Sequence, residues 1–246
     1  MRGVIAAAVL IAFAHTPAIA QPTREHLEAM RHLRLGQENL HAEHWDNAES
    51  EFQAALKLEA SLEMAHYGLG QVYMATKRYA AAVSAYLGCR HAFISNTARR
   101  ATNDLTAQRQ LDDQIRALED EKTLLATGRV NAMLSGGPID LDRRISDLRA
   151  RRFHDAKAMP ETPAWISLAL GSAYFRTGSL TDAEREYRET LKADAKIGEA
   201  HNNLAVVYML TQRYGEAESE IKAAEKAGFK VNPQLKEDLK KASSRR

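Results

Sequence analysis

Histidines are the side chains in this sequence best suited to binding a metal ion. His41 and His44 lie three residues apart in the segment HAEH, and His32 precedes them. Imidazoles at helix positions i and i+3 share a face, but a zinc site needs a third protein ligand, and the sequence indicates none. His66 and His201 occupy equivalent places in two similar segments, which indicates a shared packing or surface role. We therefore expect no metal site, and a metal-dependent enzyme using His41 and His44 is the least favoured alternative.

Other catalytic side chains do not form a recognisable set. The chain has one cysteine, Cys89, so it can form neither an intrachain disulfide nor a cysteine-based zinc site. It contains no glycine-rich phosphate loop, no Gly-x-Ser-x-Gly and no His-Glu-x-x-His motif. The sequence predicts no catalytic residues and no cofactor, and Cys89 is interpreted as a small core residue.

Charge is nearly balanced, with 34 Lys and Arg against 32 Asp and Glu and a net charge of +2. A general nucleic-acid-binding protein needs a strongly basic face, so nucleic acid is not an expected partner. The arginine-rich run at 143–152 could contact an anionic surface, but the acidic run at 112–121 is expected to neutralise it.

The first 20 residues have the pattern of a secretory signal. Arg2 precedes an apolar run from Val4 to Ala14, and Ala18-Ile19-Ala20 offers the small residues that a signal peptidase requires. The run is shorter than the roughly 20 residues needed to span a bilayer. We expect cleavage after Ala20, a periplasmic or secreted mature protein, and no integral membrane span after cleavage. The alternative is an uncleaved anchor.

The strongest pattern is an internal repeat. Residues 65–82, AHYGLGQVYMATKRYAAA, return at 200–217 as AHNNLAVVYMLTQRYGEA, and aligning them exposes four units. Each unit has Leu followed by a small residue, a second small residue further on, and a large side chain after that. The first small residues are Gly36, Gly70, Gly171 and Ala205, and the second are Ala48, Ala82, Ala183 and Ala217. Small residues at these places let two helices approach closely, while the aromatics fill the remaining space.

This 34-residue pattern resembles the tetratricopeptide repeat over 29–96 (units one and two) and 164–231 (units three and four). The resemblance implies an all-α solenoid of helix-turn-helix units in two pairs. The sequence departs from the family at Asn39, Ile221 and Thr190, and no proline closes the first three units.

Residues 97–163 interrupt the array and are predicted to form a long helical hairpin. Leu111, Ile115, Leu118 and Leu125 form a coiled-coil stripe that only Lys122 breaks. Gly128 can end this helix, SGGP at 135–138 marks the reversal, and Asp140 is a candidate N-cap of the return helix. The return stripe is Leu141, Ile145, Leu148 and Arg152. Folding back would bring the acidic run beside the arginine-rich run.

The C-terminal segment 232–246 is predicted to be a capping helix and tail. Asn232 is a suitable N-cap, and Pro233 suits the first helical position. Leu235 and Leu239 give the helix one apolar side, as the last helix of an array requires.

The resemblance also implies a groove lined by the first helix of each unit. The predicted partner-binding residues are Met64, Tyr67, Gln71, Met74, Trp165, Leu168, Ser172, Phe175, Asn202, Asn203, Val206 and Met209. Glu199 shares this lining, and unit one contributes Met30, Leu33, Gln37 and Leu40. A lining of Met, aromatic and amide side chains is suited to an apolar or amphipathic protein segment.

The preferred hypothesis is therefore a non-catalytic scaffold or adaptor of the cell envelope that binds a protein or peptide segment in this groove. The alternative is a structural protein that self-associates, as a homo-oligomer, through the hairpin at 99–158. Several groove residues would serve only packing if they contact the hairpin or neighbouring helices.

Overall fold

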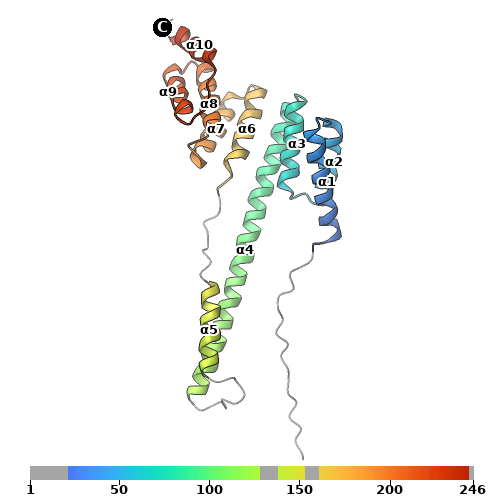
Figure 1. Ribbon diagram of the computed structural model, residues 1–246, viewed down its shortest axis with the longest axis vertical. Coiled ribbons are helices and arrows are strands. Elements are labelled where there is room, and N and C mark those ends of the chain that lie inside the picture. Colours follow the sequence, from blue (N-terminus) through green and yellow to red (C-terminus); the bar gives the residue numbers. More distant parts are fainter. Residues whose placement is uncertain (1–21, 128–137, 153–160, 244–246) are drawn as a thin grey trace, which may run out of the picture.

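The computed structural model describes residues 22–127, 138–152 and 161–243, and the described residues form ten α-helices and no strand (Figure 1). The predicted signal peptide, Gly128 and positions 135–137 of the predicted reversal lie outside the described residues. The helices are α1 (Arg24–His41), α2 (Trp45–Leu58), α3 (Glu63–Ala75), α4 (Tyr79–Ala126), α5 (Pro138–Arg152), α6 (Ala164–Thr177), α7 (Leu180–Ala193), α8 (Gly198–Leu210), α9 (Tyr214–Lys226) and α10 (Pro233–Ser243). The all-α repeat fold predicted from the sequence is confirmed.

The array consists of four helix pairs, α1–α2, α3–α4, α6–α7 and α8–α9, joined by closely similar turns. A residue with positive φ stands in each of these turns: Glu43 at 57°, Lys77 at 60°, Gly178 at 84° and Gln212 at 60°. The left-handed conformation reverses the chain within a few residues of the first helix, so the second helix folds back against it. Only the third unit uses glycine, the residue that adopts this conformation without steric cost.

Glycine and aromatic side chains form the contact within three of the pairs. A Cβ placed on Gly36 would lie 2.6 Å from Phe52, one on Gly70 would lie 2.3 Å from Tyr86, and one on Gly171 would lie 2.6 Å from Tyr187. Each aromatic ring stands four residues after the second small residue of its unit. The glycines are therefore required by the rings that cover them. In the fourth unit the smaller Ile221 takes the ring's place, and Ala205 is accommodated.

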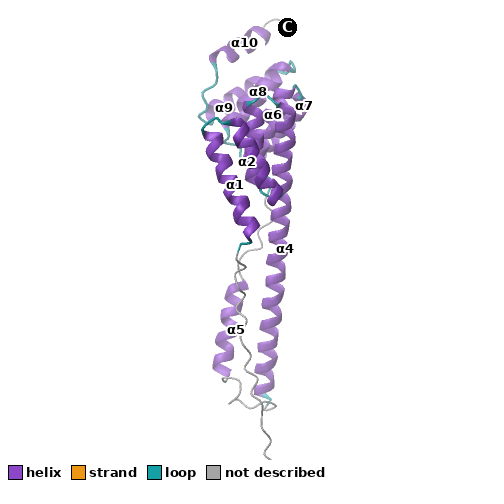
Figure 2. Cartoon of the chain, turned by 90° about the vertical axis from the view of Figure 1, so that its right-hand side faces the viewer, coloured by secondary structure: helices purple, strands orange, loops and turns teal. Residues whose placement is uncertain are grey.

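Helix α4 differs more than the other helices from the element predicted from the sequence. It is one helix of 48 residues that pairs with α3 at its start and with α5 at its end (Figures 1 and 2). The outgoing arm is therefore a continuation of the second helix of unit two, and no break separates residues 96 and 97. The physical reason is visible in the sequence, because Gly88 is the only glycine and there is no proline in this helix.

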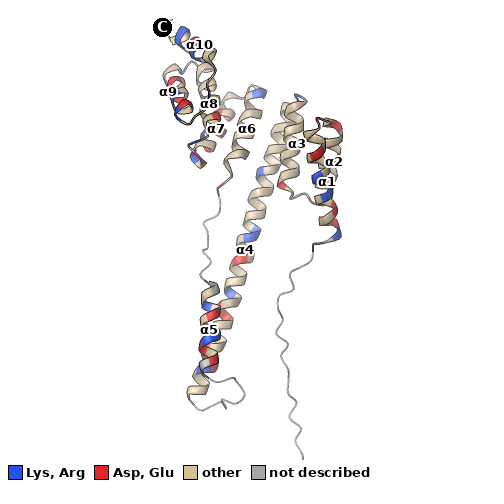
Figure 3. Ribbon diagram, in the orientation of Figure 1, with Lys and Arg blue, Asp and Glu red and all other residues tan. Residues whose placement is uncertain are grey.

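The return arm α5 packs against α4 along the predicted apolar stripes. Ile115 and Leu118 are buried against Leu141 and Ile145, and Leu125 and Leu148 pack at the margin. The acidic and basic runs lie side by side, as predicted (Figure 3). Glu119 accepts a hydrogen bond from Arg149 at 2.6 Å, and Lys122 donates to Asp142 at 2.5 Å. The lysine that interrupts the apolar stripe, Lys122, thus forms an ion pair with the return arm.

One boundary of the return arm was predicted wrongly. Helix α5 begins at Pro138, so Asp140 lies in the first turn of the helix and is not its N-cap. Proline is favoured at the first helical position because it has no N–H to leave unpaired and its φ is already helical. An acidic residue in the first turn is still favourable, since it faces the positive end of the helix dipole.

Units one and two meet units three and four where α4 packs against α6. Tyr86 and Cys89 of α4 share a buried cluster with Ile166 and Leu170 of α6. Beside this cluster Arg90 forms an ion pair with Glu186 of α7, whose side chain is 2% exposed, and Arg90 also donates to Ser167 at 3.3 Å. The array therefore continues from unit two to unit three although many residues separate them in the chain.

The C-terminal helix closes the array as predicted. Asn232 caps α10, accepting a hydrogen bond from the Gln234 N–H at 2.9 Å. Leu239 is buried and Leu235 half-buried against the apolar cluster of α8 and α9. The opposite side of α10 carries lysines that face solvent.

The covered glycines generate a matched prediction about stability. We expect Gly171→Ala to lower the free energy of unfolding by about 1–3 kcal/mol, because the new Cβ would displace the Tyr187 ring from its packed position. Gly215→Ala is the control, because a Cβ there meets nothing within 4 Å. Urea denaturation of both variants measures the difference, and equal stabilities would contradict the packing described here.

Candidate functional site

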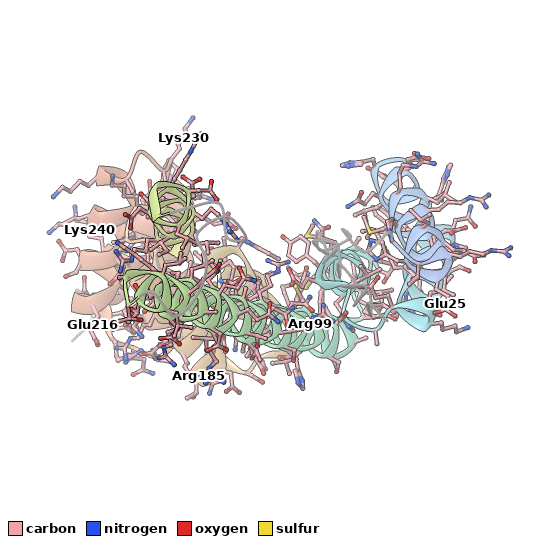
Figure 4. All side chains as sticks on the ribbon, turned by 90° about the horizontal axis from the view of Figure 1, so that it is seen from below. Glu25, Arg99, Arg185, Glu216, Lys230 and Lys240 are labelled. Atoms are coloured by element: carbon pink, nitrogen blue, oxygen red, sulfur yellow. The ribbon has the colours of Figure 1, made fainter. Side chains whose placement is uncertain are left out.

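The first helices of the four pairs, α1, α3, α6 and α8, together form one face of the array, which we call the inner face. It carries the residues predicted to line a groove. Arg185 of α7 and Glu216 of α9 project from the outer edge of the array in Figure 4. The inner face contains two pockets and an aromatic contact between them.

The first pocket lies between α1, α2 and α3 and has a volume of about 430 Å³. Three predicted groove residues line it: Met64, which is 42% exposed, Tyr67 and Gln71. Gln37 and Leu40, which unit one was expected to contribute to the groove, also line the pocket, together with His41, Trp45 and Ala75. The pocket offers apolar surface with two amide groups at its margin and no carboxylate.

The second pocket has a volume of about 190 Å³ and brings α3, α6, α7 and α8 together. Five predicted groove residues line it, namely Met74, Ser172, Phe175, Asn203 and Val206, together with Arg176 and Tyr187. The Tyr187 hydroxyl is 3.5 Å from the Ser172 hydroxyl, and burial raises the pKa of Tyr187 to about 12. At neutral pH this phenol is therefore a neutral hydrogen-bonding group in the pocket wall.

An aromatic contact connects units two and three on the inner face. The Tyr67 and Trp165 rings meet edge to face with their centroids 4.8 Å apart, and Tyr67 also contacts Tyr86 at 5.5 Å. Edge-to-face geometry is favourable because the positive edge of one ring meets the negative face of the other. Trp165 remains 37% exposed, so part of its ring is available to a ligand.

Four of the twelve predicted partner-binding residues line neither pocket: Trp165 forms the aromatic contact, and the other three serve packing or local hydrogen bonding. Leu168 and Met209 are half-buried against the C-terminal apolar cluster. The Asn202 side-chain amide Nδ2 donates a hydrogen bond to the Asn203 side-chain oxygen Oδ1 at 3.3 Å. Helical periodicity places these residues on the correct face, but it does not tell which of them a neighbouring helix covers.

Sequence reasoning missed a pair of charged clusters that recur in units two and four. Arg78 lies over the Tyr73 ring at 4.5 Å and pairs with Glu49. Arg213 lies over the Tyr208 ring at 4.1 Å and pairs with Glu184. The hydrogen bond from Arg78 lowers the pKa of Glu49. The sequence feature that could have predicted these clusters is the Arg-Tyr dipeptide, which occurs in units two and four with a glutamate at the same sequence separation before each arginine.

Of the metal candidates His32, His41 and His44, His32 has a carboxylate partner. His32 lies 2.6 Å from a Glu51 carboxylate oxygen, and His201 lies 2.5 Å from one of Glu220. The equivalent residues His66 and His201 each contact a backbone carbonyl, of Ala60 and Ala195 respectively, at 3.1 Å. This is the shared packing role that their repeat positions indicated. Within the described residues no three His, Cys, Asp or Glu side chains are grouped so as to hold a metal ion.

Stacked antiparallel helix pairs with a lined inner face define an α-helical repeat protein. A model of the tetratricopeptide repeat family matches residues 33–92 and 168–229. The chain therefore belongs to the tetratricopeptide repeat proteins, as its sequence pattern predicted. No helix in the described part of the chain is both long and apolar enough to cross a lipid bilayer.

Solved structures with a similar helical repeat fold include the type IV pilus biogenesis factor PilW, which is 16% identical over 88% of this chain and 86% of that chain, with a TM-score of 0.42. PilF of Pseudomonas aeruginosa is 15% identical over 90% of both chains, with a TM-score of 0.36. A thermophilic tetratricopeptide repeat protein of Thermus thermophilus is 19% identical over 87% of this chain and 98% of that chain, with a TM-score of 0.35. These likenesses concern the fold only. No curated protein matches the chain.

The state of Cys89 gives a direct test of its interpretation as a core residue. The side chain is fully buried, and burial raises the pKa of the thiol to about 12. Because the thiolate is the reactive form, raising the pKa lowers its reactivity at every pH below that value. We expect iodoacetamide at pH 8 to leave the native protein unmodified and to alkylate it fully in denaturant, as measured by intact mass. Rapid modification of the native protein would show that Cys89 is accessible.

Proposed function

We propose that this protein is a non-catalytic scaffold that binds an apolar or amphipathic segment of another protein on its inner face. The observation that carries the proposal is the grouping of ten predicted groove residues, Gln37 and Leu40 of unit one included, around two pockets. Methionine adapts its shape to a ligand, aromatic rings supply contact area, and the amides of Gln71 and Asn203 can bond a peptide backbone. Membership of a repeat family whose members commonly act as binding scaffolds supports a role without catalysis.

The proposal includes an organisation and a location for the chain. Residues 1–20 would be removed as a secretory signal, placing the mature protein in the periplasm or outside the cell. Units one and two would occupy 29–96 and units three and four 164–231, with the hairpin at 97–163 and the cap at 232–246. The basic start, the short apolar run and Ala18-Ile19-Ala20 support export.

The test is capture of a partner from an envelope extract by the mature chain and by a variant with Tyr67→Ala and Trp165→Ala. Buried aromatic residues carry much of the energy of many interfaces, so we expect recovery of the partner to fall about tenfold or more. Leu87→Ala is the control, since Leu87 is an exposed apolar residue of α4 outside both pockets. Circular dichroism checks that all variants fold, and equal recovery by the double variant would exclude the inner face.

A second candidate function is self-association through the hairpin. One flank of the α4–α5 pair is hollowed by a groove of about 440 Å³, whose lining includes Ala117 and Leu118 of α4 and Leu148 of α5. Gln114, Arg144 and Asp147 complete the lining. Two such flanks could pack into a four-helix bundle, in which the apolar floor of each groove would be covered.

A charge placed in this groove tests the second candidate. If hairpins self-associate, light scattering of the mature chain at tens of micromolar should give a dimer, and Ala117→Glu should give a monomer because a buried unpaired charge is costly. Thr123→Glu is the matched control, because Thr123 is exposed on α4 and does not line the groove. A monomeric wild-type chain at this concentration would exclude self-association through the hairpin.

A further inference from the structure

The inner face carries an exposed carboxylate, that of Glu199, at the start of α8. Glu199 occupies the place in unit four that Met30, Met64 and Trp165 occupy in the other three units. Within the described part of the chain, Glu199 makes neither a hydrogen bond nor an ion pair. At the corresponding places of the other units the side chain is apolar, so repeat packing does not account for a carboxylate here.

The neighbourhood of Glu199 is aromatic. The preceding unit places Trp165 at the equivalent position, and α6 contacts both α8 and, through the Trp165 ring, Tyr67 of α3. Burial raises the pKa of Tyr67, and the negative charge of Glu199 raises it further. Burial also raises the pKa of Tyr187, and the charge of Glu199 adds to this effect. Glu199 therefore stands one repeat beyond Trp165 on the inner face, on the helix that also contributes Asn203 and Val206 to the second pocket.

Two basic side chains of α6 and α8, Arg176 and His201, are engaged with other groups. Arg176, which lines the second pocket, lies over the Tyr79 ring at 4.7 Å and also donates a hydrogen bond to the Tyr79 hydroxyl. His201, two residues after Glu199, contacts Glu220 and a backbone carbonyl. The negative charge of Glu199 is thus left without a counterion from these residues.

An exposed indole and an exposed carboxylate at equivalent places on the neighbouring helices α6 and α8 are suited to a cationic side chain. The ring face attracts a cation through its quadrupole, and a guanidinium group can stack on the ring while donating hydrogen bonds to the carboxylate. Arginine fits this arrangement better than lysine, because its planar head makes both contacts at once.

We propose that the segment bound on the inner face carries an arginine that stacks on Trp165 and pairs with Glu199, next to an apolar side chain held in the second pocket. This inference rests on the proposed scaffold function and names the chemistry of its partner. The carboxylate would also disfavour segments that present an acidic residue at this place, because like charges repel.

The probe is a set of fluorescently labelled 12-residue peptides of Leu, Ala and Ser that differ only at a central residue. That residue is arginine, citrulline, which has nearly the same shape but no charge, or glutamate. Binding to the mature chain is measured by fluorescence anisotropy. We expect the arginine peptide to bind about fivefold more tightly than the citrulline peptide, and the glutamate peptide most weakly. The preference for arginine should decrease as salt is raised.

Two variants locate the preference. Glu199→Gln should remove the difference between the arginine and citrulline peptides. Glu189→Gln is the control, because it removes the same charge from an exposed ion pair with Lys192 on α7. Its arginine preference should equal that of the wild type.

The outcomes separate this inference from the scaffold function. If the wild type binds arginine and citrulline peptides equally while Tyr67→Ala weakens both, the inner face binds segments and the arginine site is wrong. If Glu199→Gln keeps the wild-type preference, the arginine site is likewise wrong. If no peptide of the set binds, or Tyr67→Ala weakens none, the result counts against both the arginine site and the scaffold function.

Discussion

The contact between α4 and α6 is the interaction on which the rest of the structure depends. The insert separates unit two from unit three in the sequence, so no short linker holds these two units together. They must associate through their side-chain contacts. Tyr86 and Cys89 supply a buried apolar surface that Ile166 and Leu170 cover. The ion pair between Arg90 and Glu186 lies at the margin of this contact, with Glu186 almost fully buried. A buried ion pair adds little net stability, but packing units two and three in another register would leave one of the two charges buried without its partner. The pair therefore favours the observed register between unit two and unit three.

This junction also creates the candidate binding surface. Tyr67 and Trp165 meet only because α3 and α6 are brought together across the insert, and the second pocket takes its walls from both halves of the chain. Neither repeat pair alone contains this pocket. The groove is therefore a product of the complete array, and any change that separates the halves would alter partner binding as well as stability.

The hairpin is joined to the array without a hinge at its outgoing end, because α4 is one uninterrupted helix. From residue 97 to its end, α4 extends roughly 45 Å at the usual rise per residue. The arm therefore keeps a direction set by the packing of α3 and α6 around the start of α4. Among the described residues, its contact with α5 includes four buried apolar side chains, with Leu125 and Leu148 at the margin, and two interhelical ion pairs that are exposed to solvent. Exposed pairs of this kind specify which surfaces meet more than they stabilise them.

The sequence by itself determined the repeat unit, because the helix-pair contact is local: a glycine and the aromatic that covers it lie within one 34-residue unit. Local spacing likewise determined the apolar stripes of the hairpin and the Asn232 cap. The continuity of α4 could also have been read from the absence of proline and of glycines beyond Gly88. Only the tertiary structure decided which inner-face residues line pockets and which are covered by neighbouring helices. It also decided that Arg90 pairs with Glu186. Those contacts join residues far apart in the chain, and periodicity specifies the face on which a side chain lies but not what packs against it.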